Sequence, residues 1–303
     1  MTEFSSHKTI ICLGLPIVRK SVVLRTMGVS RPPESKVVFA SAECPHYIRP
    51  RNDELIKSYR RPQGEGTRAK AFTLAEVLIT LGIIGIVAAL TMPALIADYK
   101  EKAAVVKVKK AYNVLSNAYN LALMENGELN SWFTNMAISD SARRVNSPIF
   151  FEKIKPHLNI IKDCGLNSGC LTPGTIHAMN GSNGDGPLDT NDRQYKFVLA
   201  DGTLVSLTVY IPGCKTNEVC GAIGIDVDGL KGPYAWGLDW FTFNFTPERL
   251  VPRGAPNDPG GETFAAACTK TTGYGCTGWV IINENMDYLH CDDLSWNGKT
   301  KCK

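Results

Sequence analysis

One acidic side chain interrupts a long apolar run in the first third of the chain. Glu76 is the only ionisable residue between Ala71 and Ala97. A carboxylate at the centre of a bilayer costs roughly 2.5 to 3.5 kcal/mol on insertion scales, so an acid in such a run usually has a function and a partner. Glu76 is therefore the first candidate functional residue. The alternative is that it snorkels to the membrane interface, which its place near the start of the run allows.

Eight cysteines follow this run at short spacings. An even set in a loop-rich region is typical of a disulfide framework in an oxidising compartment. Zinc is the competing interpretation, but structural zinc uses ligand pairs separated by about two to four residues, whereas neighbours here are separated by five, five, seven and ten. Eight cysteines allow many pairings, of which the sequential one is our prediction: Cys164 with Cys170, Cys214 with Cys220, Cys268 with Cys276, and Cys291 with Cys302.

Three aspartates raise the question of calcium, which binds carboxylate and carbonyl oxygens. Asp226, Asp228 and Asp239 are the candidate ligands. Their spacing does not match the EF-hand loop, and Asp228 followed by Gly229 is also typical of a turn without a metal. Calcium is the one cofactor that the sequence suggests.

Catalytic motifs are missing from the sequence. The three histidines after the apolar run belong to no HExxH pattern, and there is no GxSxG elbow or phosphate-binding glycine loop. We therefore expect no enzyme. The positive charge lies in residues 1–71, and the larger remainder is slightly acidic without a basic stripe, so a nucleic-acid partner is not indicated either.

The element that carries Glu76 is predicted to be one long helix over residues 72–126. Its apolar part is long enough to span a bilayer over about residues 74–97, and it exceeds the apolar region of an ordinary signal peptide. Pro93 lies inside it and should kink it. After Ala97 apolar residues recur at steps of three and four, as on one helix face: Val105, Val108, Tyr112, Leu115, Tyr119 and Ala122.

Residues 127–303 are predicted to form an exported head. Two β-type runs flank Asp201-Gly202 in residues 195–210, which indicates a hairpin. Further strands are expected within 221–229, 239–245 and 278–284. The predicted fold class is α+β: a long N-terminal helix, transmembrane in its first half and amphipathic in its second, packed on an antiparallel β-sheet head with disulfide-stapled loops. Residues 1–71 read as an unstructured leader that is removed, either an over-extended start or a long cytoplasmic leader.

The stretch "KAFTLAEVLITLGIIGIVAALTMPALIAD", residues 70–98, resembles the N-terminal segment of type IV pilins and type II secretion pseudopilins. The resemblance implies cleavage between Ala71 and Phe72 and methylation of the new amino group. Glu76 would be the fifth residue of the mature chain, and Pro93 would match the helix-bending proline of the family. Ala71 departs from the glycine that the family usually has before the cut. Residues 226–245 and 278–291 are also similar to parts of pilin-like heads.

This resemblance implies a function. The protein would be a structural subunit of a type IV pilus-like or type II secretion filament, processed by prepilin peptidase and polymerised through its N-terminal helix. Its partners would be that peptidase, other pilin-like subunits and an inner-membrane assembly platform. It would cross the bacterial inner membrane once, with the head outside the cytoplasm, and then enter an extracellular or periplasmic filament. The alternative is a monomeric, membrane-anchored exoplasmic binding or adhesion domain.

In such a filament Glu76 gains a partner. Cleavage would create a charged amine at Phe72, and the Glu76 carboxylate of one subunit could neutralise the amine of its neighbour within the apolar bundle. Either charge alone would be expensive in a medium of low dielectric constant. Glu76 would then set the register of assembly.

Overall fold

The computed structural model describes residues 72–182 and 184–302. Its longest element is helix α1 (Leu74–Asn126), which begins after the N-cap Thr73 and ends at Gly127. Gly127 has φ 76°, a conformation that glycine adopts without strain. The predicted leader, with Ala71, lies outside the described residues.

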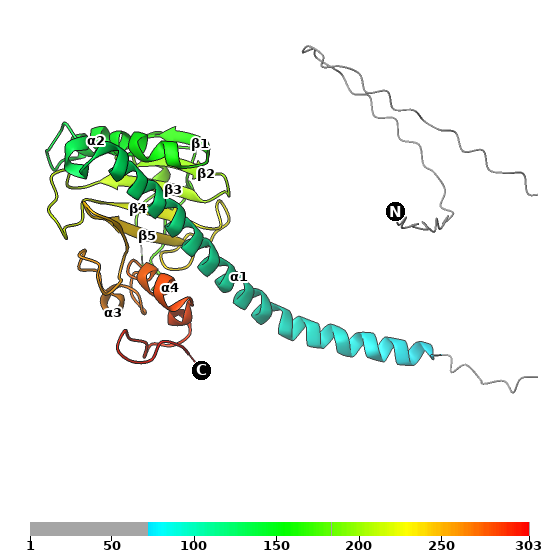
Figure 1. Ribbon diagram of the computed structural model, residues 1–303. Coiled ribbons are helices and arrows are strands. Elements are labelled where there is room, and N and C mark those ends of the chain that lie inside the picture. Colours follow the sequence, from blue (N-terminus) through cyan, green and yellow to red (C-terminus); the bar gives the residue numbers. More distant parts are fainter. Residues whose placement is uncertain (1–71, 183, 303) are drawn as a thin grey trace, which may run out of the picture. The chain divides into compact units, whose positions relative to one another are not determined.

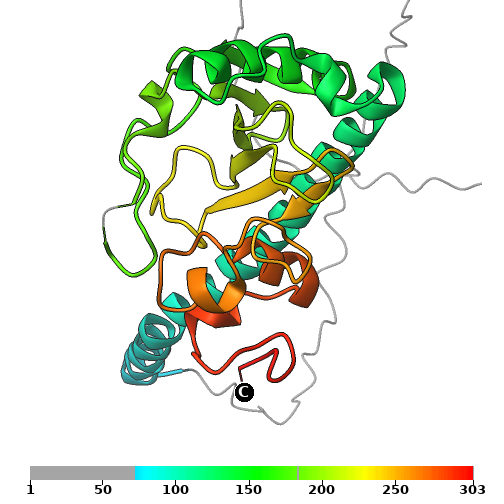
Figure 2. The same ribbon diagram turned by 90° about the vertical axis from the view of Figure 1, so that its left-hand side faces the viewer.

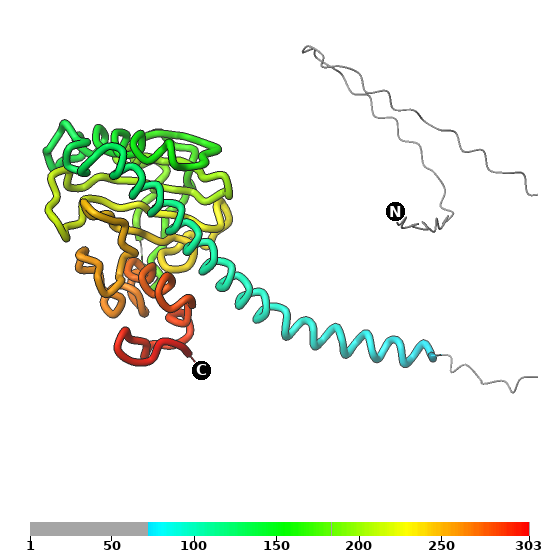
Figure 3. Tube along the Cα trace, in the orientation of Figure 1, coloured from blue at the N-terminus to red at the C-terminus, as the bar shows by residue number. Residues whose placement is uncertain are grey.

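The two halves of α1 have different surroundings. The first half extends away from the head, and no residue from Phe72 to Lys100 is buried (Figures 1 and 3). The second half lies across the head and buries one face, as the three-and-four spacing predicts. The buried members of that face are Val105, Val108, Ala111, Leu115, Ala118, Tyr119 and Ala122.

The head contains one antiparallel sheet whose strands are neighbours in space in the order in which they occur in the chain. The strands are β1 (Ile160–Gly165), β2 (Tyr195–Leu199), β3 (Leu204–Val209), β4 (Gly221–Asp226), β5 (Trp240–Phe245) and β6 (Leu250–Pro252). Asp201 and Gly202 form the turn of the predicted β2–β3 hairpin, with Gly202 at φ 87°. Together with α1, this sheet confirms the predicted α+β class.

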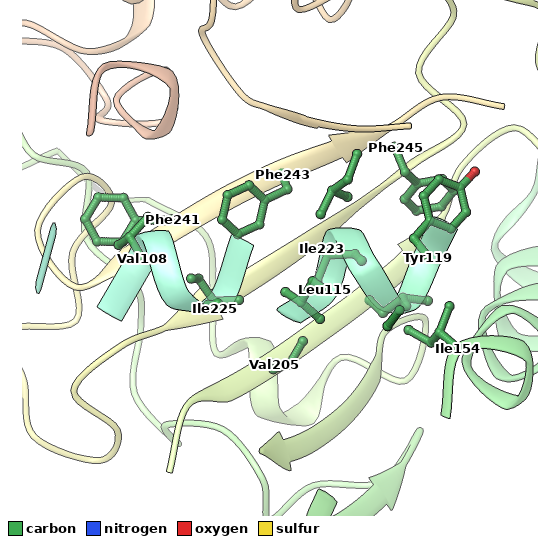
Figure 4. Packing of buried hydrophobic residues seen from close by; sticks show 14 of the residues in the cluster. Val108, Leu115, Tyr119, Ile154, Val205, Ile223, Ile225, Phe241, Phe243 and Phe245 are labelled. Atoms are coloured by element: carbon green, nitrogen blue, oxygen red, sulfur yellow. The ribbon is translucent and has the colours of Figure 1, made fainter. Parts of the chain in front are cut away.

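The main core lies between α1 and one face of the sheet. Large apolar side chains at alternate positions of β3, β4 and β5 point towards α1 (Figure 4): Val205, Ile223, Ile225, Phe241, Phe243 and Phe245. Tyr119 lies fully buried among them, and its hydroxyl donates to the carbonyl of Thr246 over 2.6 Å. The helix is thus fixed to the sheet by apolar burial and by a buried hydrogen bond.

Two further helices flank α1. Helix α2 (Asp140–Ile154) lies at the β2–β3 end of the sheet, and α4 (Thr277–Asn283) lies at the β5–β6 end, preceded by the one-turn helix α3 (Phe264–Ala267) (Figure 2). Four short 3₁₀ segments complete the described elements: η1 (Leu129–Trp132), η2 (Lys155–His157), η3 (Leu188–Thr190) and η4 (Asp287–Leu289).

The prediction of a strand over residues 278–284 is wrong, because this run forms α4. Its apolar residues Trp279 and Val280 are buried, whereas Ile282 is half exposed. Short apolar runs do not separate strand from helix by pattern, and here the surroundings decide. Glu284 ends α4 in the left-handed conformation, with φ 57°.

Four disulfides staple the loops of the head. They join Cys164 to Cys170, Cys214 to Cys220, Cys268 to Cys276, and Cys291 to Cys302. This pairing agrees with the sequential scheme expected from the sequence. Each bridge closes a short loop, so the reduced head would lose several local constraints at once.

Candidate assembly site

Glu76 already has a partner within its own subunit. Its Oε2 accepts hydrogen bonds from the Thr73 N–H over 2.8 Å and from the Thr73 hydroxyl over 3.0 Å. In return, the Thr73 Oγ1 accepts from the Glu76 N–H over 3.2 Å. This capping box satisfies backbone donors at the start of α1, where a carboxylate is also favoured by the helix dipole. This role was not predicted from the sequence, although Thr73 and Glu76 fit the T-x-x-E pattern.

The second oxygen of Glu76 remains open. Both bonds from Thr73 end on Oε2, and within the described part of the chain no donor bonds to Oε1. The side chain is exposed in the single subunit. Glu76 can therefore keep its capping role and still accept a bond from a cation outside its own chain.

The surface around Glu76 is apolar and uncovered. Phe72 and Leu74 are 85% and 78% exposed, and no residue is buried in the apolar stretch of α1 that follows them. A helix of this length and composition can cross a membrane. Two threonine hydroxyls in this segment are satisfied locally, since Thr80 and Thr91 donate to carbonyls of the preceding turn, each over 2.9 Å.

Two glycines lie in the uncovered half of α1. A Cβ atom at Gly82 or Gly85 would meet nothing within 4 Å in the single subunit, so neither glycine is required by its own fold. Glycines allow close approach between helices in a membrane. Pro93 lies within α1, and the helix continues through it to Asn126. The predicted kink at Pro93 and its role in assembly stay predictions.

Lysines in the second half of α1 form ion pairs and a hydrogen bond with several parts of the head. Lys109 pairs with Glu284 at the end of α4 over 2.5 Å, and Lys110 pairs with Asp201 in the β2–β3 turn over 2.9 Å. Lys107 donates to the carbonyl of Val227 over 2.8 Å. With the buried face, these contacts fix the line along which the apolar half leaves the head.

Two of the three candidate calcium ligands, Asp226 and Asp239, accept backbone hydrogen bonds in turns, whereas Oδ1 of Asp228 is buried without a partner among the described residues. Asp226 Oδ1 accepts from the N–H groups of Asp228 and Gly229 over 3.1 and 3.0 Å, and the Asp239 carboxylate accepts from the N–H groups of Tyr234 and Ala235, each over 2.6 Å. Among residues 72–182 and 184–302, no three His, Cys, Asp or Glu side chains are grouped so as to hold a metal. Calcium at these aspartates therefore stays a prediction.

Burial raises the pKa of all three of these carboxyl groups, most strongly at Asp226 and Asp239. It raises the pKa of Asp226 to about 8, and the neighbouring charges of Asp239 and Asp228 add to this effect. Burial also raises the pKa of Asp239 to about 6, although its backbone hydrogen bonds act in the opposite direction. The pair thus holds protons at a pH where most carboxyl groups have lost theirs.

The family model described as the prokaryotic N-terminal methylation motif matches residues 66–92. Over this segment the match supports the resemblance to type IV pilins and pseudopilins. The matched residues contain Phe72, the capping pair of Thr73 and Glu76, and most of the uncovered apolar half of α1. No curated protein and no solved structure matches the chain.

Proposed function

We propose that this protein is a structural subunit of a type IV pilus-like or type II secretion filament. Prepilin peptidase cuts the precursor between Ala71 and Phe72, the new amino group is methylated, and subunits polymerise through the first half of α1. The observation that carries the proposal is the uncovered apolar helix, which starts at the methylation motif and is joined firmly to an exported-type head. It favours a structural role in a filament.

Glu76 supplies the specificity of the polymer. Cleavage leaves an ammonium group on Phe72, and in a bundle of α1 helices this cation lies in a medium of low dielectric constant. The free Oε1 of a neighbouring Glu76 can accept a hydrogen bond from it while Oε2 keeps the Thr73 cap. Two opposite charges within hydrogen-bonding distance stabilise each other, whereas either charge alone would be buried at high cost. A stagger of the helices that brings the two groups together satisfies both charges.

The proposed partners and location follow from the two halves of the molecule. The subunit waits in the bacterial inner membrane as a single-pass protein with its head outside the cytoplasm, where four disulfides are stable. An inner-membrane assembly platform then transfers it to an extracellular or periplasmic filament of pilin-like subunits. A monomeric, membrane-anchored binding domain is the competing function.

Mass spectrometry of the N-terminus of the membrane-extracted protein tests the processing step. We expect the mature chain to begin at Phe72 with a methylated amino group. Ala71→Gly, which restores the residue usual in the family, is the matched variant and should be cut at the same bond at least as fast. A chain that keeps residues upstream of Ala71, or one cut after Ala97, would contradict the proposal and leave an anchored monomer or a secreted head.

A further inference from the structure

The face of the sheet opposite α1 carries a hollow with a volume of about 660 Å³. This size falls in the range of about 300–1,000 Å³ that small-molecule sites occupy. The hollow is separate from the assembly helix, because alternate residues of a strand point to opposite faces of the sheet.

The floor of the hollow consists of small side chains brought into rows by the strand register. Ser206 of β3 pairs with Gly224 of β4, which in turn pairs with Thr242 of β5. The next row begins with Thr208 of β3 and Ala222 of β4. On the same strands the opposite face carries Val, Leu, Ile and Phe. The hollow therefore exists because the side chains in these two rows are small. The side chains on the opposite face of the same strands are large and fill the core.

Polar groups at the floor lack partners within the protein. In the part of the chain that the structure describes, the hydroxyls of Ser206 and Thr208 form no hydrogen bond, and the Thr242 hydroxyl and the Trp236 indole N–H are buried without one. A buried polar group without a partner is destabilising, so a ligand that supplies the missing hydrogen bond is favoured there. These hydroxyls can both donate and accept, so they suit a ligand whose own groups do the same.

The charges around the hollow compensate one another. Arg144 pairs with Asp192 over 2.9 Å, and Arg253 pairs with Glu262 over 3.0 Å. Arg143 and Arg193 both contact Asp140, each over 3.2 Å. An anionic ligand would have to displace these carboxylates, and a cationic one would meet the arginines. The wall favours a neutral ligand.

One side of the hollow is aromatic. The rings of Trp236 and Tyr274 lie 4.7 Å apart between centroids, and the Tyr274 hydroxyl donates to Asp185 Oδ2 over 2.6 Å, which fixes the ring. Aromatic faces pack against the C–H faces of a sugar ring while polar side chains bind its hydroxyls. From the hydroxyl floor, the compensated charges and this aromatic wall, we infer that the hollow binds a neutral saccharide of about the size of a disaccharide.

The test uses the full-length, detergent-solubilised protein on an array of neutral and acidic glycans. The best neutral glycan is then titrated while tryptophan fluorescence is followed. We expect neutral glycans to bind and their charged counterparts to bind more weakly. If no neutral glycan binds, or if acidic glycans or peptides bind in their place, the inference is overturned.

Variants locate the site. Ala222→Leu fills the hollow and should abolish binding, and Thr208→Val should weaken it about threefold to tenfold by removing one hydrogen bond. Thr216→Val, at an exposed position outside the hollow, is the matched control and should bind as the parent does. Unchanged binding by a folded Ala222→Leu protein, checked by its melting temperature, would place the glycan elsewhere.

A second matched pair separates binding from folding. Trp236 and Trp240 both bury an indole N–H that has no partner among the described residues, but only Trp236 lines the hollow. Trp236→Phe should therefore weaken the glycan affinity, whereas Trp240→Phe should leave it unchanged. Equal effects of the two substitutions would contradict a site at Trp236. None of these results depends on processing or filament assembly.

Discussion

The Glu76 carboxylate and Thr73 form a reciprocal capping box in which only Oε2 of Glu76 is used, over 2.8 Å to the Thr73 N–H. The acid in the apolar run therefore has two separable properties. Its Oε2 completes the first turn of α1, and its negative charge is available to a second subunit. A substitution that keeps the first property and removes the second can distinguish them.

The mature protein should contain no free thiol. All eight cysteines after Phe72 are joined in the four disulfides, while Cys12 and Cys44 precede the proposed cut. Thiol labelling of the exported protein under denaturing conditions should therefore give no label without a reductant and eight labels with one. Two labels without a reductant would mean that the leader is retained. Eight would show that the bridges do not form.

The second half of α1 should contribute strongly to the stability of the head. Leu115 is 1% exposed beneath the sheet, so Leu115→Ala should lower the free energy of unfolding by about 2–5 kcal/mol. Leu121→Ala is the matched control on the same helix, since Leu121 is 43% exposed, and it should cost far less. Urea unfolding measures both. Equal losses would show that α1 does not pack by this face.

Stability of the head should fall as the pH rises from about 4 to about 8. The pKa values of Asp226 and Asp239, about 8 and about 6, exceed the value of 3.8 for an ordinary aspartate. The folded state therefore holds these protons longer than the unfolded state does. The stability that these protonated groups add to the folded state is fully present below the ordinary pKa of aspartate. It is lost as the pH rises through the two raised pKa values.

Thermal melting across this range checks the effect. Asp226→Asn keeps the Oδ1 acceptor of the turn and should reduce the pH dependence, whereas the exposed control Asp192→Asn should not reduce it in the range from 6 to 8. A pH-independent melting temperature in the parent would contradict the assignment. The same melts with calcium test the predicted metal: binding at these aspartates would raise the melting temperature most at high pH.

Long-range periodicity and turn chemistry made much of the fold predictable. The face from Val105 to Ala122 repeats over several turns, and Asp201-Gly202 allows a tight hairpin, so α1 and the β2–β3 pair follow from local pattern. The short segments do not follow from local pattern. Strands β1 and β6 and helix α4 depend on their neighbours, because an isolated run such as residues 278–284 satisfies both strand and helix patterns.

The two candidate functional sites, Glu76 and the hollow, also differ in how far the sequence predicts them. Glu76 stands out in the sequence because it is the one charge in an apolar run. The hollow could not be found there, since small residues such as Ser206, Gly224 and Thr242 come together only through the register of three strands. Alternation of small and large residues in each strand was the available signal, but it does not show which rows align.

The most direct test of the account is Glu76→Gln. Glutamine fits the same capping box, so α1 should start normally, and membrane insertion and cleavage before Phe72 should continue. The charge that compensates a neighbour's amine is lost, so incorporation into filaments should fall at least tenfold, measured by shearing and cross-linking. Thr73→Val is the matched control, because it weakens the cap, at a cost of about 1 kcal/mol, and keeps the charge. Loss of assembly in the Gln variant but not in the Val variant is the predicted result; normal assembly of the Gln variant would show that Glu76 serves its own helix alone.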